Sequence, residues 1–299
     1  MLNDSEQRYF QFEPREFIIE AIRAFTRTSP ENRLPGSDEP IFDGPLVGFA
    51  AGDDPLFTEY RQIISPGHLT PHQALAAAYE ISQEELPDKI SVISWILPIS
   101  SATRQANRHE TKAPARVWSK TRWYGEHFND ALREYVVRLL TGMGYRATAP
   151  VTQPFFKLGS DERGKLSNWS ERHIAYAAGL GTFSLSDGFI TPRGIAHRCG
   201  SVVTDLVLPP SSRTAANFQA NCLYYADGSC QECVKRCPAA AITPQDGHDK
   251  IKCSQYLYGD LEPLIREYQV EVVGCGLCQT KVPCEATNPV RQKQETASD

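Results

Sequence analysis

The chain has 299 residues, 41% of them hydrophobic and 22% charged, an ordinary globular balance that supports a substantial buried core. Its 31 Lys and Arg stand against 36 Asp and Glu, and the net charge of −5 argues against a general polyanion-binding protein. No stretch reaches the roughly 18 apolar residues of a membrane helix, and the acidic residues 1–6 lack the pattern of a secretory signal. We therefore expect a cytoplasmic protein without a membrane partner.

Helices and strands alternate in the predicted structure of the first two thirds of the chain. Apolar spacing, together with the Thr-Pro-His-Gln start at Thr70, predicts helices over residues 17–25, 70–82 and 128–140. Runs rich in Val and Ile predict strands over residues 46–50, 90–97 and 201–208, the second nearly continuously apolar like a central strand. The pattern predicts a mixed α and β domain over residues 1–215, a cysteine-rich module over 216–288 and a frayed tail over 289–299.

A basic stretch lies in the middle of the large domain. It contains a single acid, Glu110, among the six basic residues Arg104, Arg108, Lys112, Arg116, Lys120 and Arg122. Trp118, Trp123 and Tyr124 lie among or just after them. As a loop, this stretch is suited to phosphate, a cofactor or RNA, and the alternative is an ordinary solvated basic loop. If tRNA is a partner, its binding should weaken steeply with salt and depend on this segment.

A glycine-rich stretch follows, beginning at Gly179 and Gly181. Glycines of this kind let a backbone approach a flat ligand closely. Ser184 takes the place of the last glycine in a G-x-G-x-x-G pattern, which disfavours a nicotinamide site.

The cysteines carry the strongest signal in the sequence. Cys199 stands alone, and the other eight of the nine lie between Cys222 and Cys284. A large chain without an export signal is a poor candidate for a disulfide scaffold, so clustered thiols indicate metal ligands. From Cys230 to Pro238 the sequence reads C-x2-C-x3-C-P, the last part of the bacterial ferredoxin pattern, and Cys275 begins a second C-x2-C.

Eight thiolates form two sets of four, as two [4Fe–4S] clusters require. The first set is expected to contain Cys222, Cys230, Cys233 and Cys284, and the second Cys237, Cys253, Cys275 and Cys278; spacing alone permits exchanges between them. The usual pattern would place the first ligand at Asp227, and we assign it to Cys222, five residues earlier. The alternative is two zinc sites, against which the Cys-Pro pair argues. Cys199 is interpreted as a small buried residue.

Several motifs from residue 172 to residue 284 resemble the epoxyqueuosine reductase family, and more broadly the cobalamin-dependent reductases that include the reductive dehalogenases. Ala178-Gly179-Leu180-Gly181 matches the family's AGLG, and Gly200 to Asp205 matches its G-x-x-x-T-D strand. Cys253-Ser254-Gln255-Tyr256-Leu257 and Gly274-Cys275-Gly276-Leu277-Cys278-Gln279 resemble two further cysteine segments of the family.

This resemblance implies an α+β protein: a nitroreductase-like α/β cobalamin-binding domain followed by a small ferredoxin-like double [4Fe–4S] domain. It implies that a low-potential donor such as ferredoxin or flavodoxin passes electrons through two clusters to a cobalamin, which reduces a small molecule or a modified nucleoside. The expected cobalamin contacts are Gly179, Leu180, Gly181, Gly200 and Ser201.

The family's proton-donating Asp has no counterpart here, since residues 165–168 read Lys-Leu-Ser-Asn. The substitutes considered for it are Glu171, His127 and Tyr124, with Asp161 and Glu162 behind them. Two other classes of function remain open on the sequence: a ferredoxin-type electron carrier without its own substrate, and a protein that reduces or delivers cobalamin. Cobalamin binding would distinguish the reductase and the cobalamin-handling protein from the electron carrier. Turnover of an added substrate would then distinguish the reductase from the cobalamin-handling protein.

Overall fold

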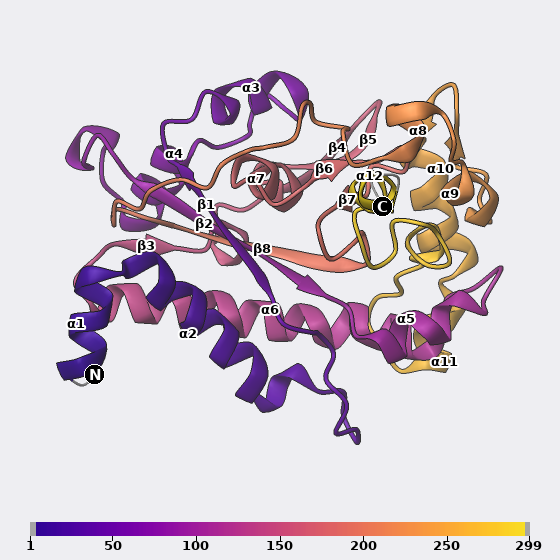
Figure 1. Cartoon of the computed structure of the whole chain (residues 1–299), viewed down its shortest axis with the longest axis horizontal. Helices are drawn as coiled ribbons and strands as arrows, with labels where there is room; N and C mark the ends of the chain where they lie inside the picture. The colour runs from indigo at the N-terminus through magenta and orange to yellow at the C-terminus, as the bar shows by residue number, and fades with distance from the viewer. Residues whose placement is uncertain (1–3, 297–299) are drawn as a thin grey trace.

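A four-stranded antiparallel sheet forms the centre of the large domain in the computed structural model, which describes residues 4–296 (Figure 1). The strand order is β1 (Leu46–Ala51), β2 (Ser91–Pro98), β8 (His197–Thr204) and β3 (Ala147–Thr148), and each neighbouring pair is antiparallel. Every residue of β2 is buried, because the strand has neighbours on both sides and helices over both faces. The predicted central strand is thus confirmed.

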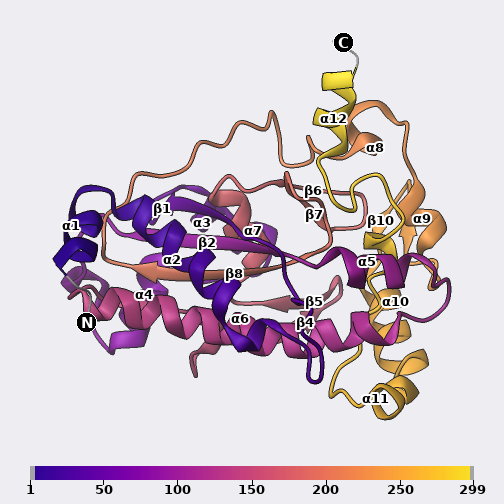
Figure 2. The ribbon, with the colours of Figure 1, turned by 60° about the horizontal axis from the view of Figure 1, so that its bottom comes forward.

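Helices cover both faces of this sheet, and strand periodicity decides which side chain meets which layer (Figure 2). Trp95 and Leu97 point to the face covered by α2 (Pro14–Thr28) and α6 (Arg116–Gly142). Val92 and Ile96 point to the opposite face, which packs on α3 (Leu56–Ile63), α4 (Pro71–Tyr79) and α7 (Glu171–Ala177). The mixed α and β character expected from the sequence is confirmed as a helix–sheet–helix sandwich.

The predicted helices are present, and their boundaries differ from the predicted ones. α4 begins with a capping box: Thr70 Oγ1 accepts from the Gln73 amide at 3.3 Å, and Gln73 Oε1 accepts from the Thr70 amide at 3.0 Å. α6 is much longer than its predicted core, because the basic residues before residue 128 continue the same helix. Phe128, Leu132 and Val136 on its inner face are fully buried, each contributing roughly 1.5–3 kcal/mol to stability.

The last predicted strand is shifted toward the N-terminus. It was expected over residues 201–208, but β8 begins at His197 and ends at Thr204. The chain leaves the sheet there because the amide of Leu206 donates to Thr204 Oγ1 and that of Leu208 donates to Ser91 Oγ. Polar residues 197–199 enter the sheet instead, paired with the end of β2.

The remaining elements surround this framework. In the large domain they are α1 (Asp4–Phe12), α5 (Ser101–Arg108), the hairpins β4 (Leu158–Asp161) with β5 (Gly164–Ser167) and β6 (Thr182–Phe183) with β7 (Phe189–Ile190), and the 3-10 turns η1 (Pro30–Asn32), η2 (Gln83–Glu85) and η3 (Pro150–Thr152). The cysteine-rich part contains α8 (Leu223–Asp227), α9 (Glu232–Arg236), β9 (Ile242–Thr243), β10 (Gly247–His248), α10 (Lys250–Gln255), the π-helix η4 (Tyr256–Asp260), α11 (Pro263–Tyr268), η5 (Leu277–Gln279) and α12 (Pro289–Thr296).

The cysteine-rich part packs beside α5 and the N-terminal end of α6 (Figures 1 and 2). The segment expected to be a frayed tail is instead helical over Pro289–Thr296, and residues 297–299 lie outside the described part of the chain. The domain boundary near residue 215 stays a prediction. Within residues 4–296, no helix has the length and apolar character needed to cross a membrane.

A buried histidine makes the stability of the large domain depend on pH. His68 is fully buried, stacks on Trp169 and accepts the Ser170 amide proton at Nε2, and burial lowers its pKa to about 4. The unfolded chain, with a histidine pKa of about 6.5, takes up this proton first, so stability present above pH 6.5 is lost as the pH falls toward 4. Urea unfolding should show His68 contributing roughly 3 kcal/mol to this loss.

His68→Gln, which keeps an acceptor for the Ser170 amide, should flatten part of that pH dependence. The exposed His109→Gln is the matched control and should leave it unchanged. An equal pH dependence in wild type and His68→Gln would contradict the prediction.

Candidate functional site

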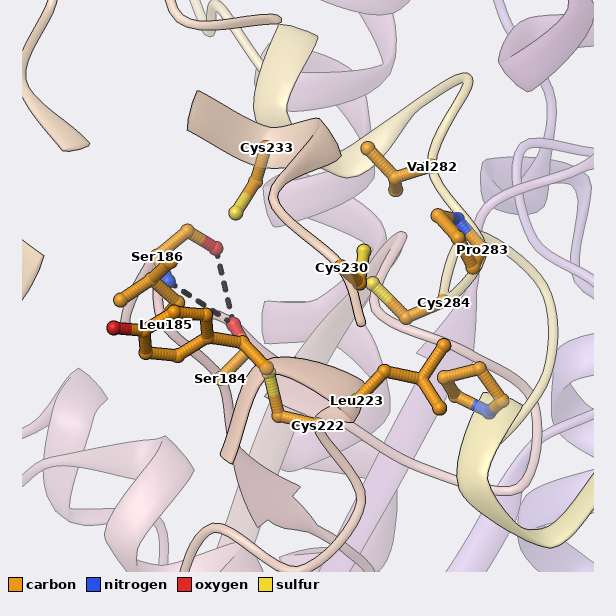
Figure 3. A pocket seen from close by; sticks show the side chains of 12 residues that line it. Ser184, Leu185, Ser186, Cys222, Leu223, Cys230, Cys233, Val282, Pro283 and Cys284 are labelled. Atoms are coloured by element: carbon orange, nitrogen blue, oxygen red, sulfur yellow. Dashed lines mark hydrogen bonds between the residues drawn. The ribbon is translucent and has the colours of Figure 1, made fainter. Parts of the chain in front are cut away.

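The first expected set of cysteines lines one cavity. Cys222, Cys230, Cys233 and Cys284 face it together with apolar side chains that include Leu185 and Val282 (Figure 3). Cys222 precedes α8, Cys233 lies in α9, and Cys284 belongs to the returning C-terminal segment. Burial, together with the neighbouring thiols of Cys222 and Cys230, raises the pKa of Cys233 to about 12. Burial and the same neighbours raise the pKa of Cys284 as well.

The second expected set gathers around Cys278. Burial raises the pKa of Cys278 well above its usual value, and the nearby thiols of Cys275, Cys253, Cys233 and Cys237 raise it further. Burial is the main cause of the rise in the pKa of Cys275 to about 11, with Cys253 and Cys237 again acting as neighbours. The thiol of Cys233 belongs to the first set, so the two sets adjoin.

Thiols this crowded and buried are poor acids by themselves. Each needs a positive partner to become the thiolate that binds metal, and metal binding would release its proton. Among residues 4–296, no three or more His, Cys, Asp or Glu side chains converge as ligands of a single metal ion. In a cubane each thiolate binds a different iron, so the chemistry of eight thiols in two sets of four fits two such clusters.

Asp227, the position where the usual ferredoxin pattern has its first ligand, is engaged elsewhere. Its carboxylate lies 2.6 Å from Lys293 Nζ and accepts the Ser229 amide proton, and these contacts lower its pKa to about 2. Cys222, in contrast, faces the cavity.

Cys199 lies apart from both sets, in β8. Its Sγ is 3.6 Å from His197 Nδ1, and burial raises its pKa to about 12. His197 Nε2 donates to the Phe189 carbonyl at 2.7 Å, which leaves Nδ1 to accept the thiol proton. This is a protonated, inward-facing cysteine.

Most of the basic stretch is helical, which corrects the expectation of a loop; Lys112 alone of the six basic residues lies in the connection between the two helices. Arg104 and Arg108 lie on α5, and the residues from Arg116 onward lie on α6. Glu285, a buried acid next to Cys284, forms ion pairs with Arg104 at 3.6 Å and with Arg108 at 3.1 Å. These arginines therefore hold the cysteine-rich part against the large domain.

Arg236, directly before Cys237, is the centre of this seam, and sequence reasoning missed it. Its guanidinium donates to the carbonyls of Asn107 and Glu110 at the end of α5 and to those of Leu277 and Thr280 beside Cys278. The only sequence signal was an arginine next to a candidate ligand.

Trp118 of α6 covers the loop between Cys275 and Cys278. Gly276 there has a φ of +59°, and a Cβ on it would lie 2.1 Å from the indole. The loop can approach α6 so closely only because this residue is glycine.

The residues considered as proton donors are dispersed. Glu171 is held by Arg133 at 3.1 Å and accepts from Ser201 Oγ at 2.6 Å, and burial raises its pKa despite Arg133. His127 is exposed on α6, with its ring centre 4.3 Å from that of Trp123 and 6.1 Å from that of Tyr124. Asp161 pairs with Arg163.

The five residues expected to contact cobalamin face the protein's own atoms. A Cβ at Gly179 would lie 2.7 Å from the Ser212 carbonyl oxygen, and one at Gly181 2.3 Å from the Ile190 carbonyl oxygen. One at Gly200 would meet Trp95 and Asn129 within 2.7 Å, and Leu180 and Ser201 are buried. The Cβ positions of the three glycines are thus occupied by the chain's own atoms, and cobalamin contact at the five residues stays a prediction. Close internal packing explains their glycines.

Comparison with known proteins confirms the family resemblance. An epoxyqueuosine reductase from Bacillus anthracis is 29% identical over 119 residues, 38% of this chain and 29% of that protein. An epoxyqueuosine reductase structure from Bacillus subtilis aligns at 19% identity and a TM-score of 0.47, covering 92% of this chain and 66% of its own. No family model matches the chain.

A catabolic reductive dehalogenase in complex with 3-bromo-4-hydroxybenzoic acid aligns at 15% identity with a TM-score of 0.50, over 93% of this chain and 37% of its own. That match shows a shared fold. This chain spans less than two thirds of the length of the relatives named here.

Proposed function

We propose that this relative of the epoxyqueuosine reductases is an iron–sulfur reductase in which two [4Fe–4S] clusters carry electrons to the seam between the two parts of the chain. The observations that support this proposal are that four of the cysteines line one cavity and that Cys278 has the thiols of Cys275, Cys253 and Cys237 among its neighbours. Cys222, Cys230, Cys233 and Cys284 would hold one cluster, and Cys237, Cys253, Cys275 and Cys278 the other.

The packing supports a direction for the electrons. Cys233 of the first set is an electrostatic neighbour of Cys278 of the second, so transfer between the clusters would be short. The second set lies under Trp118 and beside Gly274, which packs on Arg122 of α6. In this proposal a low-potential donor such as ferredoxin or flavodoxin reduces the first cluster, and the substrate is reduced near the second.

The substrate in this proposal is a small molecule or a modified nucleoside, in line with the sequence resemblance. All nine cysteines are free, which suits a reducing compartment such as the cytoplasm. Cobalamin is the cofactor that the resemblance implies, and when bound it would supply a strongly reducing metal centre. The residues expected to contact it stay a prediction, and we derive no step through it.

Anaerobic purification of the intact chain tests the proposal. Iron and sulfide should each reach about eight per chain, with a brown colour and the electron paramagnetic resonance of reduced [4Fe–4S] clusters. Added cobalamin is then titrated while its spectrum is followed for loss of the lower base. A colourless protein containing zinc would refute the proposal, and clusters without turnover of any added substrate would favour an electron carrier.

A further inference from the structure

We propose that Arg236 makes the second cluster the better electron acceptor of the two, because its permanent positive charge lies beside Cys278 and the cavity of the first set has no such charge. This inference rests on the proposed function and gives a physical cause for the direction of transfer stated there. In this step a reduced ferredoxin or flavodoxin loses one electron, and the second cluster gains it by way of the first. No bond at the cysteines forms or breaks, and no proton moves.

Arg236, the last residue of α9, is fixed against the second set by hydrogen bonds. Its Nε donates to the carbonyl oxygens of Leu277 at 3.2 Å and Thr280 at 3.0 Å, which precede and follow Cys278 in the chain. Two further bonds, to carbonyls at the end of α5, hold the other guanidinium nitrogens. Burial raises the pKa of Cys275, and the charge of Arg236 opposes that rise.

This guanidinium has no acid to neutralise it. Within residues 4–296, the hydrogen bonds of Arg236 all go to carbonyl or hydroxyl oxygens, and it forms no ion pair with an Asp or Glu. Glu285, the buried acid of the seam, is already paired with Arg104 and Arg108. Arg236 is partly buried and keeps its proton, so a negative group beside it would be stabilised. The thiolates of a bound cluster are such a group.

The cavity of the first set differs in charge. Among the described residues, those that line it contribute thiols, apolar groups, a tyrosine and the hydroxyls of Ser184 and Ser186, and none is charged (Figure 3). Lys235 lies in the electrostatic neighbourhood of Cys230, but it is exposed and paired with Glu232 at 2.7 Å. Solvent and this acid screen its charge. A cluster in this cavity would therefore have little help in accepting an electron.

Two other cations near the second set are paired with acids. Arg122, whose stem packs against the loop before Cys275, meets Glu126 together with Arg198. They belong to a cluster of three arginines and three acids, namely Arg122, Arg133 and Arg198 with Glu126, Asp130 and Glu171. His248, a neighbour of the second set, lies 3.3 Å from Asp187. Arg236 differs from these cations because it has no such partner.

A positive charge favours the reduced form of a cluster, because reduction adds an electron to a centre that four thiolates already make negative. At an effective dielectric constant of about 20, a unit charge roughly 8 Å away changes the ratio of reduced to oxidised cluster about tenfold or more. For a one-electron couple, tenfold corresponds to about 59 mV. The electron should therefore remain on the second cluster, next to the large domain.

A redox titration of the anaerobically purified chain, followed by electron paramagnetic resonance, provides the test. Wild type should show two midpoint potentials, and Cys278→Ser, which should keep only the first cluster, should retain the lower one. Arg236→Met should move the higher potential down by about 59 mV or more, and Arg236→Lys, which keeps the charge, should move it much less. Lys235→Met, which removes the neighbouring exposed cation, is the matched control and should leave the higher potential unchanged.

Retention of the higher potential in Cys278→Ser, or unchanged potentials in Arg236→Met, would overturn the inference. Equal shifts in Arg236→Met and Arg236→Lys would also overturn it, because they would assign the effect to lost hydrogen bonds. Should the Arg236 variants fold poorly by circular dichroism, wild type and Cys278→Ser decide, since both keep Arg236. Iron analysis of the same samples separates the two ideas: two clusters with the opposite order of potentials remove only this inference, whereas a chain without iron–sulfur clusters removes the proposed function itself.

Discussion

Replacing Cys278 by Ser should halve the iron content of the anaerobically purified protein, from about eight to about four per chain. Cys278 is the most central thiol of the second set, with Cys275, Cys253 and Cys237 around it. A serine hydroxyl is a far weaker ligand than a thiolate, so that cluster should be lost while the first set keeps its own. Iron and sulfide analysis, with electron paramagnetic resonance of the reduced sample, measures the change.

Cys199→Ser is the matched control for this experiment. Cys199 is a partly buried cysteine of the same chain that lies outside both expected sets and donates to His197. Its replacement should leave iron and sulfide unchanged. Full iron content in Cys278→Ser, or loss of a cluster in Cys199→Ser, would show that the cysteines are grouped wrongly.

Arg236→Met should lower the free energy of unfolding by roughly 3 kcal/mol or more. The substitution keeps much of the side-chain volume but removes the donors that four carbonyl oxygens share, those of Asn107, Glu110, Leu277 and Thr280. The Asn107 and Leu277 carbonyls keep the backbone amides of Glu110 and Thr280 as donors. The carbonyls of Glu110 and Thr280 lose their donor, at about 1–3 kcal/mol for a buried carbonyl, and these costs are not independent. Chemical denaturation under anaerobic conditions measures the loss.

The neighbouring Lys235→Met provides the comparison. Lys235 is exposed and forms a surface pair with Glu232 at 2.7 Å, a contact that contributes little to stability because solvent screens it. It should therefore change stability little. Equal stabilities of the two variants would mean that Arg236 does not hold the seam together.

The features predicted correctly from the sequence are those coded over short distances. The capping box at Thr70, the apolar run of β2 and the inner face of α6 each depend on neighbouring residues, and each is confirmed. The length of α6 was underestimated because its first turns carry basic residues, which resemble a loop in the sequence. Arg104 and Arg108 of α5 likewise resemble a solvated run until their buried partner is known. That partner, Glu285, lies more than 170 residues further along the chain.

The packing role of the glycines could not be predicted for the same reason. Gly179, Gly181 and Gly200 resemble a ligand cradle in sequence, but the atoms that require them to be glycine are Ser212, Ile190 and Trp95, which only the fold brings near. Likewise, no local pattern could reveal that Arg122 and Arg198 meet at Glu126. The grouping of the cysteines into two sets stays a prediction that iron analysis can decide.

The segment around Cys284 and Glu285 couples assembly of the metal centre to the packing of the cysteine-rich part on the large domain. The Cys284 carbonyl accepts the Ile195 amide proton at 2.8 Å, and the backbone of Glu285 presses against Gly194, where a Cβ would be 2.3 Å from its carbonyl oxygen. The segment Cys284–Glu285 thus contacts both the thiol cavity and the large domain. A metal cluster bound in the cavity would therefore also stabilise the contact between this segment and the large domain. Without iron, this segment should therefore unfold locally before the rest of the chain, and limited proteolysis should cleave there first.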